Sequence, residues 1–174
     1  MRAALSGFNV LIAGRVCLDL GAAAGGFTRV LLEAGASRVY AVDAGFGQLL
    51  GSLRQDPRVV NLEATNVAAL DGRLIPEAIE VVTVDVSYLA LAAAVAQLDR
   101  ITIASDADLI GLVKPMFELR LATAPSEPGI VAAATERAAA GIVAAGWQVV
   151  GAMPSPVLGG RGAVEALVHA RRSP

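Results

Sequence analysis

Three ionisable side chains stand in otherwise apolar segments of the sequence. Asp85 and Lys114 each directly follow a run of aliphatic residues, and Glu165 interrupts another such run. A charge in an apolar strand costs free energy unless it is paired, so we expect the three side chains to meet. An amine beside two carboxylates can take a proton from a hydroxyl group, which makes Lys114, Asp85 and Glu165 the candidate catalytic residues. The alternative is a buried salt cluster without a catalytic task.

The use of lysine in this chain favours a catalytic role. Lys114 is the one lysine in the sequence, in which Lys and Arg together number 14. Arginine stays charged, whereas a lysine amine can lose its proton and then act as a base. An ordinary lysine has a pKa of about 10.4, which neighbouring carboxylates raise and a neighbouring cation lowers. A lysine base beside two carboxylates therefore needs a second cation nearby to lower its pKa. Arg2 would provide this cation in part if a first helix placed it over the crevice.

A glycine-rich turn follows a further short apolar segment. Residues 18–28 read Leu-Asp-Leu-Gly-Ala-Ala-Ala-Gly-Gly-Phe-Thr, a strand that leads through glycines into a helix. Such a turn brings the backbone close to a ligand beneath the N-terminus of the helix. Asp43 ends the next predicted strand, where an acid suits the hydroxyls of a ribose. The spacing differs from the dinucleotide fingerprint G-x-G-x-x-G and resembles the first motif of S-adenosylmethionine (SAM) methyltransferases; a tight turn without a ligand is the alternative.

Strands and helices alternate along the chain. We predict strands near 15–20, 38–43, 58–62, 79–85, 108–113, 147–153 and 164–170. We predict helices near 26–35, 46–54, 88–98 and 130–145, with a short leading helix at 1–7 and a long functional loop at 115–129. This alternation predicts one doubly wound α/β domain over residues 1–174, with a mostly parallel sheet. The connection between the last two strands is too short for a crossover helix, so these strands should pair antiparallel.

The same topology brings the candidate residues together. In a doubly wound sheet the ligand crevice lies outside the carboxyl ends of the parallel strands. Asp43 and Asp85 end predicted strands and Lys114 follows one, so all three should share that edge. Glu165 should reach it because its strand runs in the opposite direction and begins there.

Composition limits the other classes of function. Hydrophobic residues make up 55% of the chain, but no apolar run reaches the roughly 18 residues of a membrane span. No signal peptide is visible, and the one cysteine (Cys17) and one histidine (His169) make a Cys- or His-based metal site improbable. We therefore expect a soluble cytoplasmic protein with no membrane partner and no metal. The net charge of −2 gives no support to tight autonomous binding of nucleic acid.

Several blocks of the sequence are similar to one family, in order and at matching spacing. They are the turn at 19–28 and the segments 39–49, 53–59, 84–88 and 112–118. On these blocks the chain resembles the TlyA family of ribosomal RNA 2′-O-methyltransferases, also named hemolysins, within the wider FtsJ-like group. The resemblance implies a Rossmann-like fold with a seven-stranded, mostly parallel sheet and an antiparallel C-terminal hairpin strand. It also implies SAM as cofactor and cytidine riboses of 16S and 23S rRNA as substrate.

The resemblance assigns roles to single residues. It implies a Lys-Asp-Lys-Glu tetrad, of which Asp85, Lys114 and Glu165 are three members, while the first lysine falls just ahead of Met1. Asn66 follows the third predicted strand, where methyltransferases often place a polar side chain against adenine. The expected cofactor-binding residues are Asp19, Gly21, Gly25, Gly26, Phe27, Thr28, Asp43, Asn66 and Asp85.

Departures from the family leave other functions open. An N-terminal S4-like RNA-binding domain is absent from the sequence, so the chain is either cut from the family architecture or shortened. The family's Gly-Asn-x-Glu reads Gly-Ala-Val-Glu at 162–165, which removes a polar group from the face expected to meet RNA. The alternatives are a SAM-dependent methyltransferase of a small hydroxylated metabolite and a SAM-binding remnant without catalysis.

Overall fold

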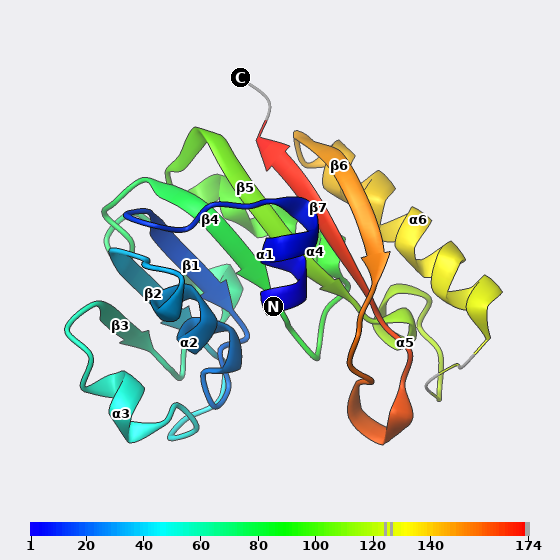
Figure 1. The fold of residues 1–174 in the computed structure, drawn as a ribbon, viewed down its shortest axis with the longest axis horizontal. Helices are drawn as coiled ribbons and strands as arrows, with labels where there is room; N and C mark the ends of the chain where they lie inside the picture. The colour runs from blue at the N-terminus through cyan, green and yellow to red at the C-terminus, as the bar shows by residue number, and fades with distance from the viewer. Residues whose placement is uncertain (124, 126, 173–174) are drawn as a thin grey trace.

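Runs of Val, Ile and Leu form the strands of a single mixed sheet. The computed structural model describes residues 1–123, 125 and 127–172. Within them the sheet has seven strands in the order β3-β2-β1-β4-β5-β7-β6 (Figure 1). The strands are β1 (Val16–Leu20), β2 (Arg38–Val42), β3 (Val59–Leu62), β4 (Ile79–Val84), β5 (Ile103–Val113), β6 (Trp147–Pro154) and β7 (Ala166–Arg172). The helices are α1 (Arg2–Phe8), α2 (Gly26–Glu33), α3 (Gly51–Arg54), α4 (Leu91–Val95), α5 (Pro115–Glu118) and α6 (Pro128–Ala144), with 3-10 turns η1 (Val67–Ala69), η2 (Ala96–Arg100) and η3 (Gly160–Gly162).

The direction of β7 distinguishes it from the rest of the sheet. β1, β2, β3, β4 and β5 form parallel ladders, whereas β7 is antiparallel to both β5 and β6. The predicted fold class is thus confirmed, including the antiparallel pairing of the last two strands. The register places Val113 opposite Ala166. The residues just beyond this pair, Lys114 and Glu165, therefore lie at the same edge of the sheet.

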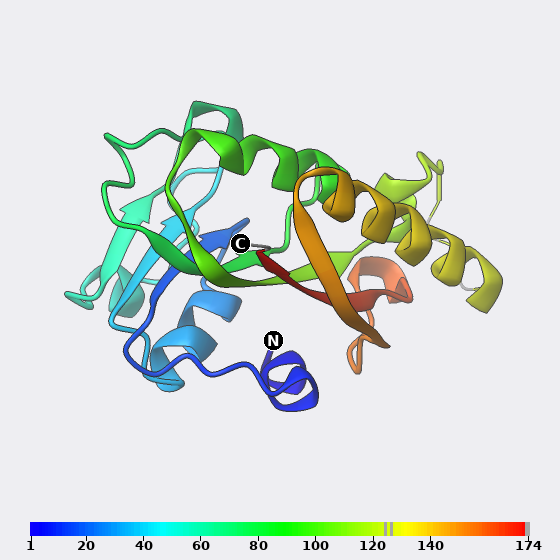
Figure 2. The same ribbon diagram turned by 90° about the horizontal axis from the view of Figure 1, so that it is seen from above.

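Helices cover both faces of the sheet and define two apolar layers (Figure 2). α4 and α6 pack on one face, over buried residues such as Leu20, Val84 and Leu109. α1 and α2 pack on the other, over Cys17 and Ile110. Strands buried on both faces read as continuous hydrophobic runs, which is why the sequence shows no simple alternation there.

Two segments differ from their predicted structure. The helix predicted at 46–54 is reduced to the short α3. The residues before it form a loop, which is held by the side chains of Asp43 and Glu63. Asp43 accepts a hydrogen bond from Gly45 N, and Glu63 accepts bonds from the backbone N–H groups of Gln48 and Leu49. These bonds hold residues 45–49 as a loop, and the helix begins only at Gly51.

The segment predicted as a loop at 115–129 contains the short helix α5 and the start of α6. Pro115 is the first residue of α5, a position that suits its fixed φ and missing N–H. Residues 124 and 126 of this segment lie outside the described residues. β5 also begins five residues earlier than predicted, at Ile103, and Glu165 directly precedes β7 instead of lying inside it.

Over the described part of the chain, every helix is too short or too polar to cross a bilayer.

Candidate active site

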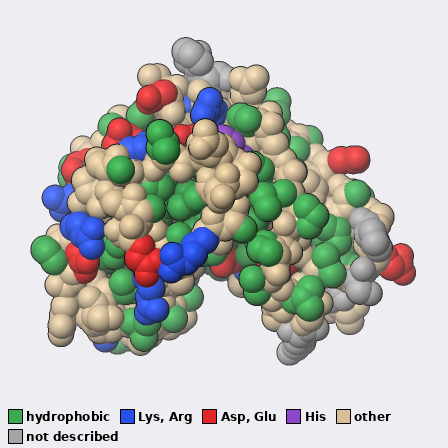
Figure 3. Space-filling view, in the orientation of Figure 1, with side chains coloured by type: hydrophobic (Ala, Val, Ile, Leu, Met, Phe, Trp, Pro, Cys, Tyr) green, Lys and Arg blue, Asp and Glu red, His purple; other side chains and the backbone are tan. Residues whose placement is uncertain are grey.

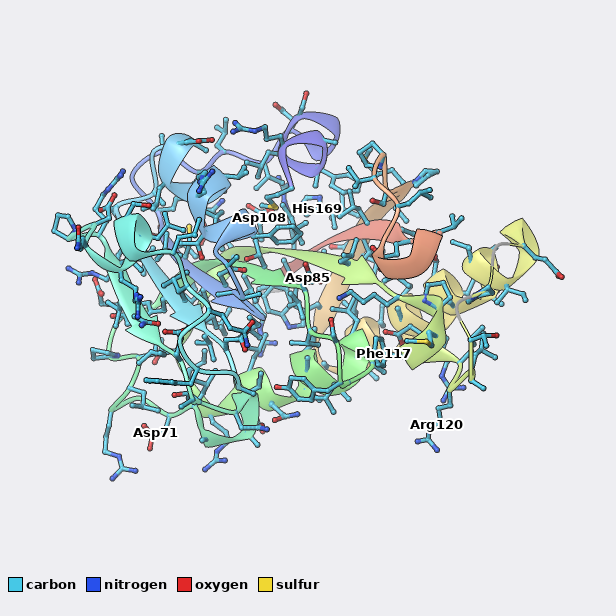
Figure 4. All side chains as sticks on the ribbon, turned by 90° about the horizontal axis from the view of Figure 1, so that it is seen from below. Asp71, Asp85, Asp108, Phe117, Arg120 and His169 are labelled. Carbon is cyan, nitrogen blue, oxygen red and sulfur yellow. The ribbon has the colours of Figure 1, made fainter. Side chains whose placement is uncertain are left out.

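The carboxyl ends of the parallel strands meet at one edge of the sheet and carry the predicted acids and lysine. Asp43 follows β2, Asp85 follows β4 and Lys114 follows β5. Viewed onto this edge, Asp85 lies near the centre of the molecule (Figure 4). The space-filling view shows the molecule hollowed at the same edge, beside the loop between β6 and β7 (Figure 3).

Lys114 makes two polar contacts at this edge. Its Nζ lies 2.6 Å from Asp85 Oδ1 in an ion pair. The same ammonium donates a hydrogen bond to Ser87 Oγ at 2.7 Å. The amine is thereby held between a charged and a neutral oxygen, both from the segment that follows β4.

Glu165 faces the same space without touching Lys114. Its side chain is buried, and no ion pair joins it to Lys114 among the described residues. Burial raises the pKa of the Glu165 carboxyl, the Lys114 charge opposes the shift and the Asp85 charge adds to it. The carboxylate packs against Gly159, where a Cβ atom would lie 2.3 Å from Glu165 Oε1. The three predicted catalytic residues are therefore brought together, with one direct pair and one facing carboxylate.

Two cavities open beside this cluster. One, which we call the acceptor cavity, has a volume of about 580 Å³ and is lined by residues that include Ser87, Lys114, Pro115, Met116, Phe117 and Glu165. The other, which we call the cofactor cavity because it adjoins the glycine-rich turn, measures about 300 Å³. Its lining includes Gly21, Ala23, Asp43, Thr65, Val67 and Asp85. Ser87 is the one described residue that lines both cavities.

Asp43 is the acid of the cofactor cavity. Its two oxygens accept hydrogen bonds from Ala23 N at 2.8 Å and Gly45 N at 2.7 Å. Each carboxylate oxygen has a second lone pair, so hydroxyls of a ribose can still be accepted. Asp43 thus ties the glycine-rich turn to the loop after β2 and faces the cavity between them.

Gly21 has a structural reason for its identity. Its φ is +85°, and a Cβ atom there would lie 2.3 Å from the backbone oxygen of Asp85. The glycine lets the turn after β1 approach the end of β4, which brings the cofactor cavity next to Asp85. Gly25 also has a positive φ and caps the N-terminus of α2.

Asp19 lies behind the cavity, not in its lining. It is fully buried and accepts hydrogen bonds from the hydroxyls of Thr28 and Thr83, at 2.6 and 2.8 Å. Burial raises the pKa of Asp19 to about 6, while the two hydroxyls oppose the shift. Asp19 and Thr28 therefore fix the start of α2 against β1 and β4.

The other predicted cofactor residues lie around this turn. Gly26 begins α2 and Phe27 is half-buried, and neither is part of the cavity lining. Asn66 accepts a hydrogen bond from Ala68 N and caps η1, between the lining residues Thr65 and Val67. Whether these residues contact a cofactor remains a prediction.

The expectation for Arg2 is wrong. Its guanidinium pairs with Glu33 of α2, an exposed ion pair, and not with the acids of the candidate site. Burial lowers the pKa of the Met1 amino group, and the charge of Asp85 opposes this shift.

Ser87 and Gly159 match the family in sequence, but no role was predicted from the sequence for either residue. Ser87 stands two positions after Asp85, a spacing that places both side chains on the same side of an extended segment. That spacing was the available signal. Gly159 carried no such signal, because its contact with Glu165 depends on how the loop folds.

His169 lies away from this edge. It is buried, and its Nε2 lies 2.7 Å from Asp108 Oδ1, within a cluster that also holds Arg15 and Arg171. No group of three or more potential metal ligands occurs among the described residues.

Comparison with known proteins identifies the family of the chain. The sequence profile of the FtsJ-like methyltransferase family matches residues 1–172. The chain belongs to the FtsJ-like methyltransferase family. It is 42% identical to the 16S/23S rRNA (cytidine-2′-O)-methyltransferase TlyA of Mycobacterium tuberculosis, over 97% of this chain and 64% of that protein. This FtsJ-like methyltransferase therefore spans less than two thirds of that relative's length.

Solved structures confirm the fold. A structure described as a hemolysin from Streptococcus thermophilus matches this FtsJ-like methyltransferase with a TM-score of 0.92 and 34% identity, over 99% of this chain and 64% of that chain. A SAM-dependent methyltransferase from Mesorhizobium loti matches with a TM-score of 0.68 and 16% identity, over 97% of this chain and 96% of that chain. The second similarity supports the fold alone.

Proposed function

We propose that this chain is a SAM-dependent methyltransferase that methylates a ribose 2′-hydroxyl of ribosomal RNA, with cytidine as the modified nucleoside. The observation that carries the proposal is the contact of Lys114 with Asp85 and Ser87 at the junction of two cavities. One cavity has an acid suited to a ribose, and the other has room for an acceptor beside an amine.

The residues of the cofactor cavity fit a nucleoside cofactor. Asp43 would accept the ribose hydroxyls, and the backbone of Gly21 and Ala23 would lie along the amino-acid part. Val67 offers an apolar contact for the adenine ring. SAM bound there would supply an electrophilic methyl group.

In this proposal Lys114 is the base and its neighbours position it. In the fraction of molecules in which Lys114 has lost its own proton, its neutral amine takes the proton of the ribose hydroxyl, which leaves the oxygen nucleophilic. Asp85 stabilises the ammonium that forms, and Ser87 restrains the direction of Nζ. Glu165 lies across the acceptor cavity, where its carboxylate would accept a hydrogen bond from a sugar hydroxyl.

The substrate class rests on relatives. The mycobacterial relative is named as an enzyme of 16S and 23S rRNA, and the family is FtsJ-like. A ribosomal substrate would place the chain in the cytoplasm with the ribosome as its partner. This chain carries a net charge of −2, which favours a small hydroxylated metabolite as the second candidate substrate.

Methyl transfer from labelled SAM to unmodified 16S and 23S rRNA transcripts tests the proposal. We expect 2′-O-methylcytidine after nuclease digestion and mass spectrometry. Lys114→Arg keeps the charge and the ion pair but cannot release a proton, so it should bind SAM and lose transfer. Appreciable transfer by Lys114→Arg would exclude Lys114 as the base.

The same assay separates the two substrate classes. Binding of rRNA fragments that weakens as salt rises indicates phosphate contacts. Methylation of small alcohols without any RNA methylation would instead support the metabolite. SAM binding without transfer to either class would identify a cofactor-binding remnant.

A further inference from the structure

A second groove opens on the far side of α5 from the acceptor cavity. It measures about 510 Å³, and its lining includes Tyr88, Ala93, Met116, Phe117, Arg120 and Leu121. Met116 and Phe117 also line the acceptor cavity, so α5 forms a wall common to both spaces. We call this space the flanking groove.

The flanking groove combines an apolar wall with a cation at its rim. Phe117 is half-buried, and Tyr88 is 45% exposed, so both rings are accessible from the groove. Arg120 is exposed and forms no ion pair among the described residues. Figure 4 shows its side chain extended away from the ribbon, beyond Phe117.

The backbone at Arg120 makes its position specific. Its φ is +54°, in the left-handed region that non-glycine residues seldom adopt. Arg120 thus turns the chain sharply just after α5. This left-handed residue ends α5, where Leu121 N donates a hydrogen bond to Met116 O, and it thereby fixes the place of Arg120 at the rim of the groove.

We propose that the flanking groove binds the nucleotide next to the one that is methylated, with its base against Phe117 and Tyr88 and its phosphate at Arg120. This inference rests on the proposed function and deepens it. A ribose inside a polynucleotide must enter the acceptor cavity with its neighbours attached. The neighbour then needs a site just outside that cavity, and the groove shares a wall with it.

The chemistry of the groove matches such a nucleotide. Bases stack on aromatic side chains whatever their sequence, because every base has a π face. Arginine pairs with phosphate oxygens through its planar fork of donors. A small hydroxylated metabolite would occupy the acceptor cavity alone and leave this groove unused.

Ala93→Phe tests the groove without touching the residues that bind or react. Ala93 is exposed on α4 and lines the groove, so the larger side chain fills it. We expect the KM for rRNA transcripts to rise about tenfold, with unchanged SAM affinity. Ala140→Phe, at an exposed position of α6 outside the groove, is the matched control and should leave KM unchanged.

Arg120→Ala tests the phosphate contact. It should raise the KM for RNA several-fold. The slope of log affinity against log salt concentration should also become shallower, by the amount expected for about one phosphate contact. Arg73→Ala is the control, because Arg73 is exposed and pairs with Asp71 at another loop. Equal KM values for each variant and its control would overturn the proposal.

Synthetic RNA separates this inference from the proposed function. The probes are nine-nucleotide single strands with a central cytidine, either intact or with an abasic ribose on one side of it. For the wild type, loss of one flanking base should weaken binding about tenfold, whereas Ala93→Phe should bind both probes alike. If the wild type binds both probes equally and still methylates rRNA, the groove does not bind the neighbouring nucleotide, and the proposed function stands. Absence of methyl transfer to any RNA would reject the proposed function together with the groove.

Discussion

Ser87 Oγ accepts a hydrogen bond from Lys114 Nζ at 2.7 Å, at the boundary between the acceptor and cofactor cavities. Asp85 holds the same amine by charge, but a charge alone does not fix a direction. The hydroxyl adds that direction, and it does so where an acceptor oxygen and a methyl donor would have to meet.

Ser87→Ala should therefore slow methyl transfer without lowering the affinity for SAM. A hydrogen bond to a charged group contributes roughly 1.5 kcal/mol, so we expect about a tenfold fall in kcat. Ser87→Thr keeps the hydroxyl and should retain most of the rate. Single-turnover assays and calorimetry with SAM provide the measurement, and equal rates for Ser87→Ala and the wild type would remove Ser87 from the site.

Gly159→Ala should displace the Glu165 carboxylate without removing its charge. The φ of Gly159 is −72°, which alanine adopts freely, but the new Cβ would lie 2.3 Å from Glu165 Oε1. If relief of this clash moves the carboxylate by about 1 Å, the rate should fall roughly 10- to 100-fold. Gly72→Ala is the control, since nothing lies within 4 Å of that Cβ. Unchanged turnover in Gly159→Ala would show that the position of Glu165 does not matter for the reaction.

Asp43→Ala should weaken SAM binding. Loss of charge-assisted hydrogen bonds worth roughly 1.5–3 kcal/mol lowers affinity about 10- to 150-fold. Asp43 also accepts bonds from two backbone N–H groups, so the loop itself needs a control. Glu63→Ala loosens the same loop at Gln48 and Leu49 and should have a much smaller effect. Calorimetry that finds equal losses in the two variants would assign the effect to the loop.

Asp19 should make the stability of the fold depend on pH. Burial raises the pKa of Asp19 to about 6 in the folded chain, from an unfolded value of about 3.9. The folded state then binds more protons than the unfolded state between these values. The stability contribution of this group is therefore full below about pH 4 and is lost as the pH rises to about 6.

Asp19→Asn should remove that dependence. The difference in unfolding free energy between this variant and the wild type should change between about pH 4 and 6 and level off above. Urea unfolding at closely spaced pH values measures it. Asp106→Asn, at an exposed acid, should show no such step. Parallel curves for the wild type and Asp19→Asn would contradict the role of burial.

The sequence predicted the elements that hold the candidate catalytic residues because their signals are local. Aliphatic runs followed by Asp43, Asp85 and Lys114 place the three residues at strand ends, and the short last connection predicts the reversed strand that brings Glu165 to them. The loop at 44–50 could not be predicted in the same way. Its shape depends on Glu63, which reaches it from beyond β3.

The helix α5 and the contact of Gly159 with Glu165 escaped prediction for a related reason. α5 has only four residues, too few to leave a periodic pattern in the sequence. The contact at Gly159 depends on tertiary packing of a loop rich in glycine. The assignment of Arg2 failed because helix α1 turns it toward Glu33, a partner that spacing alone does not reveal.

The placement of β7 between β5 and β6 has a consequence for how the enzyme is made. Strands β1, β2 and β4 can pair as they leave the ribosome, whereas β6 has no neighbour in the sheet until β7 has been synthesised. Glu165 directly precedes that final strand and comes to lie beside Lys114 only when the strand inserts. On an unfinished chain Glu165 would therefore lie away from Lys114, and the cluster of these side chains would form only after β7 has joined the sheet.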